Sequence, residues 1–212
     1  MITKKDYLIA GEIGILTGIF ALVSLFFINI SFPYDKVAVP LGIAVLWVLG
    51  VWLGGFLGKH VAPFFTQFGK FAATGFFSAS IDFAALNFIS YLTGITAGVV
   101  VGWINIPGFL LAVLNGYVWN KLWVFKSQTR FRSLIDLNLV WGKGGVFSDF
   151  PKFLLVTVIG LLLNSGVIIL LTTYISGLGF TAQIWLNIAK VAANALAMIW
   201  NFAGYKFIVF RK

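Results

Sequence analysis

A positive charge lies within one of the most apolar stretches of the chain. Residues 186–202, LNIAKVAANALAMIWNF, contain Lys190 together with Asn187, Asn194 and Asn201. At helical spacing these four side chains fall within about 60° of one another, so they form one stripe along a helix face. An ammonium group can hold a phosphate as a point charge, and amides can hydrogen-bond to sugar hydroxyls. The chemistry of such a stripe would suit a ligand that carries both a phosphate and a sugar.

A carboxylate in another apolar stretch is expected to lie near this lysine. Asp82 shares a helix face with Gly75 and Ser78. At ~1.5 Å per residue, Asp82 lies about 16 Å and Lys190 about 12 Å from the outer end of its own helix. Ions inside a membrane usually mark a transport pathway, but two opposite charges at one depth also favour a structural ion pair. Both interpretations of Lys190 stay open.

Further polar and aromatic residues complete the predicted site. Tyr117 and Trp119 can stack on a sugar ring, although such aromatic residues often anchor helices at membrane interfaces. Lys121 and Lys206 can capture the phosphate first, although flanking lysines also extend to the interface merely to set topology. The predicted substrate-binding residues are Lys190, Asp82, Asn164, Asn187, Asn194, Asn201, Asn115, Asn120, Lys121, Lys206, Tyr117 and Trp119.

The composition is that of an integral membrane protein. Of 212 residues, 60% are hydrophobic and 10% are charged, and the mean hydropathy is +1.01. Soluble domains have about 25% charged residues. The chain has no cysteine, a single histidine and no glycine-rich nucleotide-binding motif, so we expect no metal, no cofactor and no enzyme activity. The net charge of +9 has its explanation in topology and does not indicate nucleic acid.

Six apolar segments predict an all-α fold with six transmembrane helices, at about 8–32, 37–59, 69–93, 98–122, 151–175 and 182–206. All of the 15 basic residues except Lys36 and Lys190 fall at the N-terminus, in the second or fourth loop, or at the C-terminus. With six helices these four regions lie on one side of the membrane. Because basic loops are retained in the cytoplasm, both termini are predicted to be cytoplasmic.

The last four helices form an internal repeat, 67–126 and 149–211. The first helix of each copy aligns at an offset of 82, with Lys70 on Lys152 and Asp82 on Asn164. The second helix of each copy aligns at an offset of 85, with Lys121 on Lys206. Both copies begin on the same side, so the sequence predicts two parallel hairpin repeats, between which transport sites often form.

Residues 1–62 stand outside the repeat and are predicted to form an accessory hairpin beside a four-helix domain, 63–212. Gly50, Gly54 and Gly58 recur every fourth residue, which favours close helix packing or a homo-oligomer surface. The longest polar stretch, 126–149, is basic with scattered apolar residues. This composition agrees with an amphipathic segment on the cytoplasmic membrane surface, and equally with an ordinary solvated loop.

Residues 67–211 resemble the GtrA-like family of small four-helix membrane proteins. The resemblance rests on FGKFAATGFFSASIDF, LNGYVWNKLWVF, FPKFLLVTVIGLLLN and NIAKVAANALAMIWNFAGYKFIVF, in that order. The hairpin at 1–62 departs from the four-helix plan, and Tyr205 stands where the first copy has Asn120.

The resemblance implies flipping of a polyprenyl-phosphate-linked monosaccharide across the cytoplasmic membrane, for glycan modification at the cell surface. Its partners would then be that lipid, the surrounding membrane lipids and a glycosyltransferase. Two other functions stay open. One is a membrane scaffold that docks a polyprenyl-phosphate glycosyltransferase through 126–149. The other is a proton-coupled exporter with Asp82 as the proton carrier.

Overall fold

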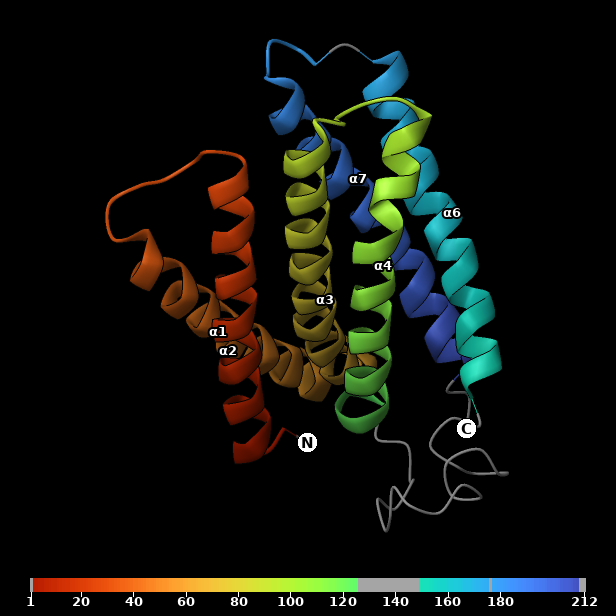
Figure 1. The fold of residues 1–212 in the computed structure, drawn as a ribbon. Coiled ribbons are helices and arrows are strands. Elements are labelled where there is room, and N and C mark those ends of the chain that lie inside the picture. Colours follow the sequence, from red (N-terminus) through yellow and green to blue (C-terminus); the bar gives the residue numbers. More distant parts are fainter. Residues whose placement is uncertain (1, 126–148, 176, 210–212) are drawn as a thin grey trace, which may run out of the picture.

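Six long helices make up the described part of the protein, as the hydropathy of the sequence predicts (Figure 1). The computed structural model describes residues 2–125, 149–175 and 177–209, so the polar stretch 126–149 lies outside the described residues except for its last residue. The helices are α1 (Lys4–Phe27), α2 (Asp35–His60), α3 (Phe64–Thr93), α4 (Val99–Trp119), α6 (Phe150–Tyr174) and α7 (Ala182–Gly204). All six, the last turns of α4 and α7 included, are long and apolar enough to span a bilayer.

Helix α1 begins and ends about four residues earlier than its hydropathy predicts. Its start is fixed by Asp6, whose carboxylate accepts hydrogen bonds from the backbone N–H of Thr3 at 2.7 Å and its hydroxyl at 2.9 Å. Its end is fixed near Asn29, which adopts the left-handed conformation with φ 58° that commonly terminates helices. Hydropathy cannot locate either signal, because the apolar run continues to Phe32.

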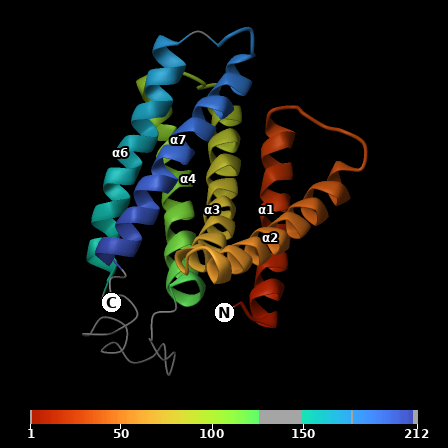
Figure 2. The ribbon, with the colours of Figure 1, turned by 180° about the vertical axis from the view of Figure 1, so that it is seen from behind.

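Four of the helices form a bundle and the other two pack on one side of it. Helix α3 packs along α4, α6 packs along α7, and α4 contacts α6. Helices α3 and α7 touch much less. Helix α1 runs beside α3, and α2 crosses α1 and α3 obliquely (Figure 2). The N-terminal hairpin is therefore attached to the bundle through α3.

Small residues allow the hairpin to approach closely, as the glycine spacing predicts. A Cβ atom on Gly54 would lie 2.9 Å from the carbonyl oxygen of Phe65 and 3.0 Å from the Cα of Gly69. These distances leave no room for a side chain between α2 and α3. Gly14 and Gly18 of α1 similarly face the backbone of Ala44 and Pro40 in α2.

Gly54→Leu is expected to destabilise the protein by about 1–3 kcal/mol, because the added side chain forces α2 away from α3. Gly42→Leu on the same helix is the matched control, since a Cβ atom there meets no atom within 4 Å. The measurement is the thermal unfolding midpoint of each variant in detergent. Equal midpoints for the two variants would show that the α2–α3 contact contributes little.

A buried ion pair also ties the hairpin to the bundle. Lys70 of α3 lies 2.5 Å from Asp6 of α1, and both side chains are 4% exposed. The indole of Trp123 donates a further hydrogen bond of 2.8 Å to the same carboxylate oxygen. Asp6 therefore joins the beginning of α1 to the beginning of α3 and to the segment that follows α4.

Helices α4 and α7 both end in a π-helical turn, η1 (Asn120–Val124) and η2 (Tyr205–Val209). The two turns lie 85 residues apart, which is the offset at which the second helices of the sequence repeat align. Turns of this kind are rare and often occur at functional sites. Their matching positions agree with the two-copy arrangement inferred from the sequence.

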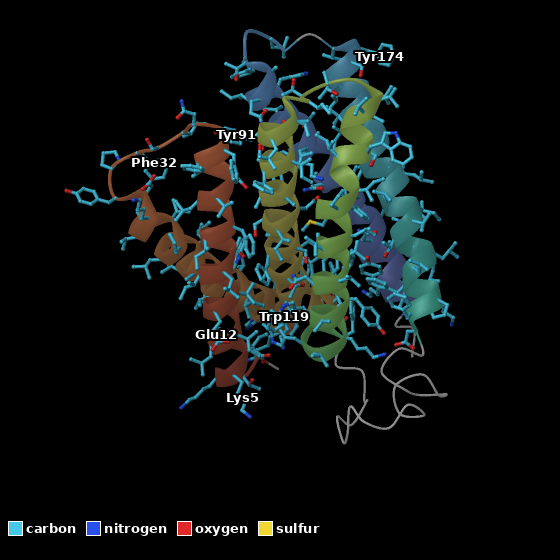
Figure 3. All side chains as sticks on the ribbon, viewed as in Figure 1. Lys5, Glu12, Phe32, Tyr91, Trp119 and Tyr174 are labelled. Atoms are coloured by element: carbon cyan, nitrogen blue, oxygen red, sulfur yellow. The ribbon has the colours of Figure 1, made fainter. Side chains whose placement is uncertain are left out.

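The described helix ends show which loops lie together. Helices α1, α3 and α6 begin, and α4 and α7 end, at one end of the bundle, called here the terminal end (Figure 1). Lys5 and Trp119 lie toward this end, whereas Tyr91 and Tyr174 lie at the opposite end (Figure 3). Aromatic residues near both ends are typical of membrane–water interfaces. That the terminal end faces the cytoplasm stays a prediction.

Cysteine labelling tests this orientation, and the native chain has no cysteine that would interfere. Tyr34 lies between α1 and α2 and is 87% exposed, so a thiol at Tyr34→Cys is expected to react with a membrane-impermeant reagent added to intact cells. A thiol at Lys59→Cys, near the end of α2, is expected to react only after the cells are opened. The reverse pattern would invert the orientation.

Candidate functional site

Lys190 lies at the centre of a buried polar cluster. Its Nζ is 2.5 Å from Oδ2 of Asp82, so the expected meeting of the two charges is present, and both residues are buried. The ammonium also donates to Oδ1 of Asn105 and, at 3.3 Å, to Oδ1 of Asn164. An ammonium group has three N–H donors. All three are used by these acceptors, which come from three other helices.

The cluster joins matching positions of the two repeat copies. Asp82 aligns with Asn164 at the offset of 82, and Asn105 aligns with Lys190 at the offset of 85. The two amides also bond directly, because Nδ2 of Asn105 donates to Oδ1 of Asn164 at 3.1 Å. Each copy therefore contributes one residue from each of its two helices, and the charges are divided between the copies.

A second polar network holds α3 against α7 farther from the terminal end. Asn87 and Asn187 each donate to the other through their side-chain amides, at 2.8 Å in both directions. Gln183 donates to Asn87 at 2.9 Å, and the hydroxyl of Ser90 donates to Gln183 at 3.1 Å. Together with the Asp82–Lys190 pair, these bonds close the space between α3 and α7 in the half of the bundle away from the terminal end.

A cavity of about 370 Å³ occupies the other half, between α3, α4 and α7. Its volume falls within the ~300–1,000 Å³ typical of small-molecule sites. Val191 and Phe76 belong to its lining and are 60% and 48% exposed, so the cavity reaches the lipid-facing surface between α7 and α3. Most of the lining is apolar, and its polar members are Ser78, Asp82, Asn120, Asn194, Asn201 and Tyr205.

Within the described residues, four buried side-chain atoms have no hydrogen-bond partner, and all four belong to residues that line this cavity. They are Oδ1 of Asp82, Oδ1 of Asn120, Nδ2 of Asn194 and Oδ1 of Asn201. The side-chain amide of Asn194 interacts with the Asp82 carboxylate, Oδ1 of Asn201 lies against Gly160 of α6, and Oδ1 of Asn120 has no hydrogen-bond partner. Buried polar atoms are nearly always satisfied, so atoms without partners that gather in one cavity indicate a ligand or water there.

The predicted stripe on α7 is thus divided between two structures. Asn194 and Asn201 line the cavity, and Asn194 also accepts a 2.6 Å hydrogen bond from Asn164. Lys190 and Asn187 belong instead to the polar networks that close α3 against α7. Asp82 belongs to both, because Oδ2 of its carboxylate binds Lys190 and the residue also lines the cavity.

The remaining predicted residues, except Asn120, lie outside the cavity. Tyr117 is buried against Phe153, with ring centroids 4.6 Å apart, and the hydroxyl of Tyr117 accepts a 3.3 Å bond from Lys121. Lys121 also forms an ion pair with Asp149 at 3.1 Å. Asn115 donates to the hydroxyl of Ser78 at 2.9 Å. The ring of Trp119 lies 6.3 Å from that of Trp123, and Lys206 belongs to η2, the turn that follows α7.

Three site residues were not predicted from the sequence: Asn105, Ser78 and Tyr205. The internal repeat contained a signal for two of them. Asn105 aligns with Lys190, and Tyr205 aligns with Asn120. Asn120 and Tyr205 begin the two π-helical turns and both line the cavity. Ser78 aligns with Gly160, which carries no polar side chain, so the repeat gave no signal for it.

A family model for the GtrA/DPMS transmembrane domain matches residues 70–210. The match covers the four-helix bundle, including the cavity and both polar networks, and leaves out α1 and α2. No curated protein and no solved structure matches the chain.

Proposed function

The chain belongs to the GtrA/DPMS transmembrane-domain family, and from this premise we propose that it flips a polyprenyl-phosphate-linked monosaccharide across the cytoplasmic membrane. The observation that supports this proposal is the cavity between α3, α4 and α7, with its unpartnered polar atoms and its opening toward lipid. It offers hydrogen-bonding groups to a sugar while a polyprenyl chain stays in the bilayer.

The chemistry of the cavity fits a neutral sugar. The side-chain amides of Asn120, Asn194 and Asn201 in the lining supply donors and acceptors for sugar hydroxyls. Apolar C–H surfaces of a sugar ring pack against the phenyl groups in the lining, such as Phe71 and Phe109.

The proposed process is transport without covalent change, and no residue is assigned a catalytic role. Only the sugar and phosphate head must pass through the protein, because the lipid tail can turn within the bilayer. Access from the opposite side then requires the polar networks of Asp82–Lys190 and Asn87–Asn187 to separate. The concentration gradient of the lipid supplies the driving force in this account.

The experiment is translocation in liposomes that contain only the purified chain. A fluorescent polyprenyl-phosphate sugar is placed in both leaflets, and a membrane-impermeant reagent then destroys the accessible label. Flipping predicts loss of nearly all label, whereas protein-free liposomes lose only the outer half. The scaffold function predicts a different result. Only half of the label would be lost in the presence of the protein alone, and translocation of the labelled lipid would appear only when a glycosyltransferase is added.

The proton-coupled exporter makes a different prediction in the same liposomes. With Asp82 as proton carrier, an imposed pH gradient would change the rate of translocation severalfold. Flipping driven by the lipid gradient predicts equal rates of translocation with and without the pH gradient. Asp82 is bound to Lys190 in the structure, so a proton on this carboxyl group would have to compete with the ammonium.

A further inference from the structure

Three lysines of the bundle are neutralised by aspartates within the described part of the chain. These pairs are Lys70 with Asp6 at 2.5 Å, Lys121 with Asp149 at 3.1 Å, and Lys190 with Asp82 at 2.5 Å. Their ammonium groups are therefore poor candidates to receive the phosphate of a lipid. Among the residues that the structure describes, the cavity lining contains no lysine or arginine. A lipid phosphate beside the cavity needs another cation.

Lys206, in the π-helical turn η2, is arranged differently. Its Nζ lies over three phenyl rings, 5.0 Å from the centroid of Phe64, 5.6 Å from that of Phe202 and 5.5 Å from that of Phe207. Its repeat counterpart Lys121 has an aspartate partner, but no carboxylate forms an ion pair with Lys206 anywhere in the described ranges. Aromatic faces attract the charge but leave the N–H donors free for an anion.

The position of Lys206 relative to the cavity is set by its neighbours. Tyr205 and Asn201 both line the cavity. The ring of Phe202 lies 4.9 Å from that of Phe71, another lining residue. Lys206 is thus at the terminal side of the opening between α3 and α7, five residues beyond Asn201 along the chain.

We propose that Lys206 binds the phosphate of the lipid while the attached sugar occupies the cavity. This inference rests on the proposed function and adds the position of the charged group to it. Lys206 is partly exposed, so a lipid phosphate can reach it from the bilayer surface. Phe207, 63% exposed, faces lipid beside it, where the first isoprene units of the tail can lie.

The test measures binding of geranylgeranyl phosphate to the purified protein in detergent, with geranylgeraniol as the ligand that lacks the phosphate. Lys206→Gln is expected to weaken binding of the phosphate by about 10- to 100-fold, as expected for the loss of a hydrogen bond between charged groups. Lys206→Arg retains the charge and is expected to bind within about threefold of the wild type. Binding of geranylgeraniol should not change.

Lys152→Gln is the matched control. Lys152 is exposed near the beginning of α6, at the same end of the bundle, and does not line the cavity. Its loss removes the same charge from that end and is expected to leave binding unchanged. Equal weakening by both variants would indicate nonspecific attraction by surface charge and would overturn the inference. Unchanged binding in Lys206→Gln would overturn it as well.

Two further results separate this inference from its premise. If the wild type binds geranylgeranyl phosphate no more tightly than geranylgeraniol, the proposed function itself is in error. If dioleoyl phosphatidylglycerol displaces the probe as well as unlabelled geranylgeranyl phosphate does, the site holds any lipid phosphate, and a dedicated polyprenyl-phosphate subsite is excluded. We expect displacement by the prenyl phosphate alone.

Discussion

Replacing Lys190 with Met is expected to destabilise the protein by about 3–5 kcal/mol, the usual cost of removing one partner of a buried ion pair. Lys190 is fully buried, and its loss leaves the Asp82 carboxylate without a counter-charge among the described residues. Asn105 and Asn164 also lose the donor that they share. Met has about the same length but cannot replace any of these bonds. Thermal unfolding in detergent measures the effect.

The double variant Lys190→Met with Asp82→Asn is expected to recover most of this stability. Neutralising both partners removes the uncompensated charge, and the amide can still bond to neighbouring polar groups. A double variant as unstable as Lys190→Met would show that the ion pair is not the source of the loss. Asp82→Asn alone is expected to be destabilised too, because it leaves the ammonium unpaired.

The same double variant separates the two interpretations of Lys190 that the sequence leaves open. If Lys190 acts through the ion pair, the folded double variant should bind geranylgeranyl phosphate as tightly as the wild type. If Lys190 itself holds the phosphate, binding should be lost although the protein is folded. The structure favours the first result, because all three donors of the ammonium are already used.

Hydropathy and charge were enough to predict the six helices, and shared depth and face were enough to predict the contact of Lys190 with Asp82. These features follow from the bilayer, which fixes helix length and makes an isolated charge costly. The same bilayer hides which apolar face of a helix points inward, because lipid-facing and buried residues are equally apolar. The sequence therefore could not place Tyr117 against Phe153, or show that the cavity lies between α3, α4 and α7.

Two other features of the structure were not predicted from the sequence, and each has a local cause. The sequence analysis placed residues on regular helices, so it could not anticipate the two π-helical turns, η1 and η2. Partner identity was also not predictable for Lys121, because Asp149 lies at the far end of a polar stretch and its position relative to α4 depends on the packing of α6.

Ala197→Phe is expected to abolish translocation while the protein still folds. Ala197 is 4% exposed and lines the cavity on α7. A phenyl ring at this position extends into existing space of about 370 Å³, so it fills the volume proposed for the sugar with little displacement of the neighbouring helices. Ala192→Phe is the matched control, because Ala192 lies on the same helix, is exposed, and does not line the cavity.

The most direct test of the cavity as the transport site is the initial rate of translocation of a fluorescent polyprenyl-phosphate sugar. The rate is measured in liposomes that contain only the wild type or one of these two variants. We expect a rate for Ala197→Phe at least about tenfold below that of the wild type, which corresponds to a barrier raised by ~1.4 kcal/mol or more. Ala192→Phe should match the wild type. Equal rates for Ala197→Phe and the wild type, with both proteins folded, would contradict the claim that the sugar passes through this cavity.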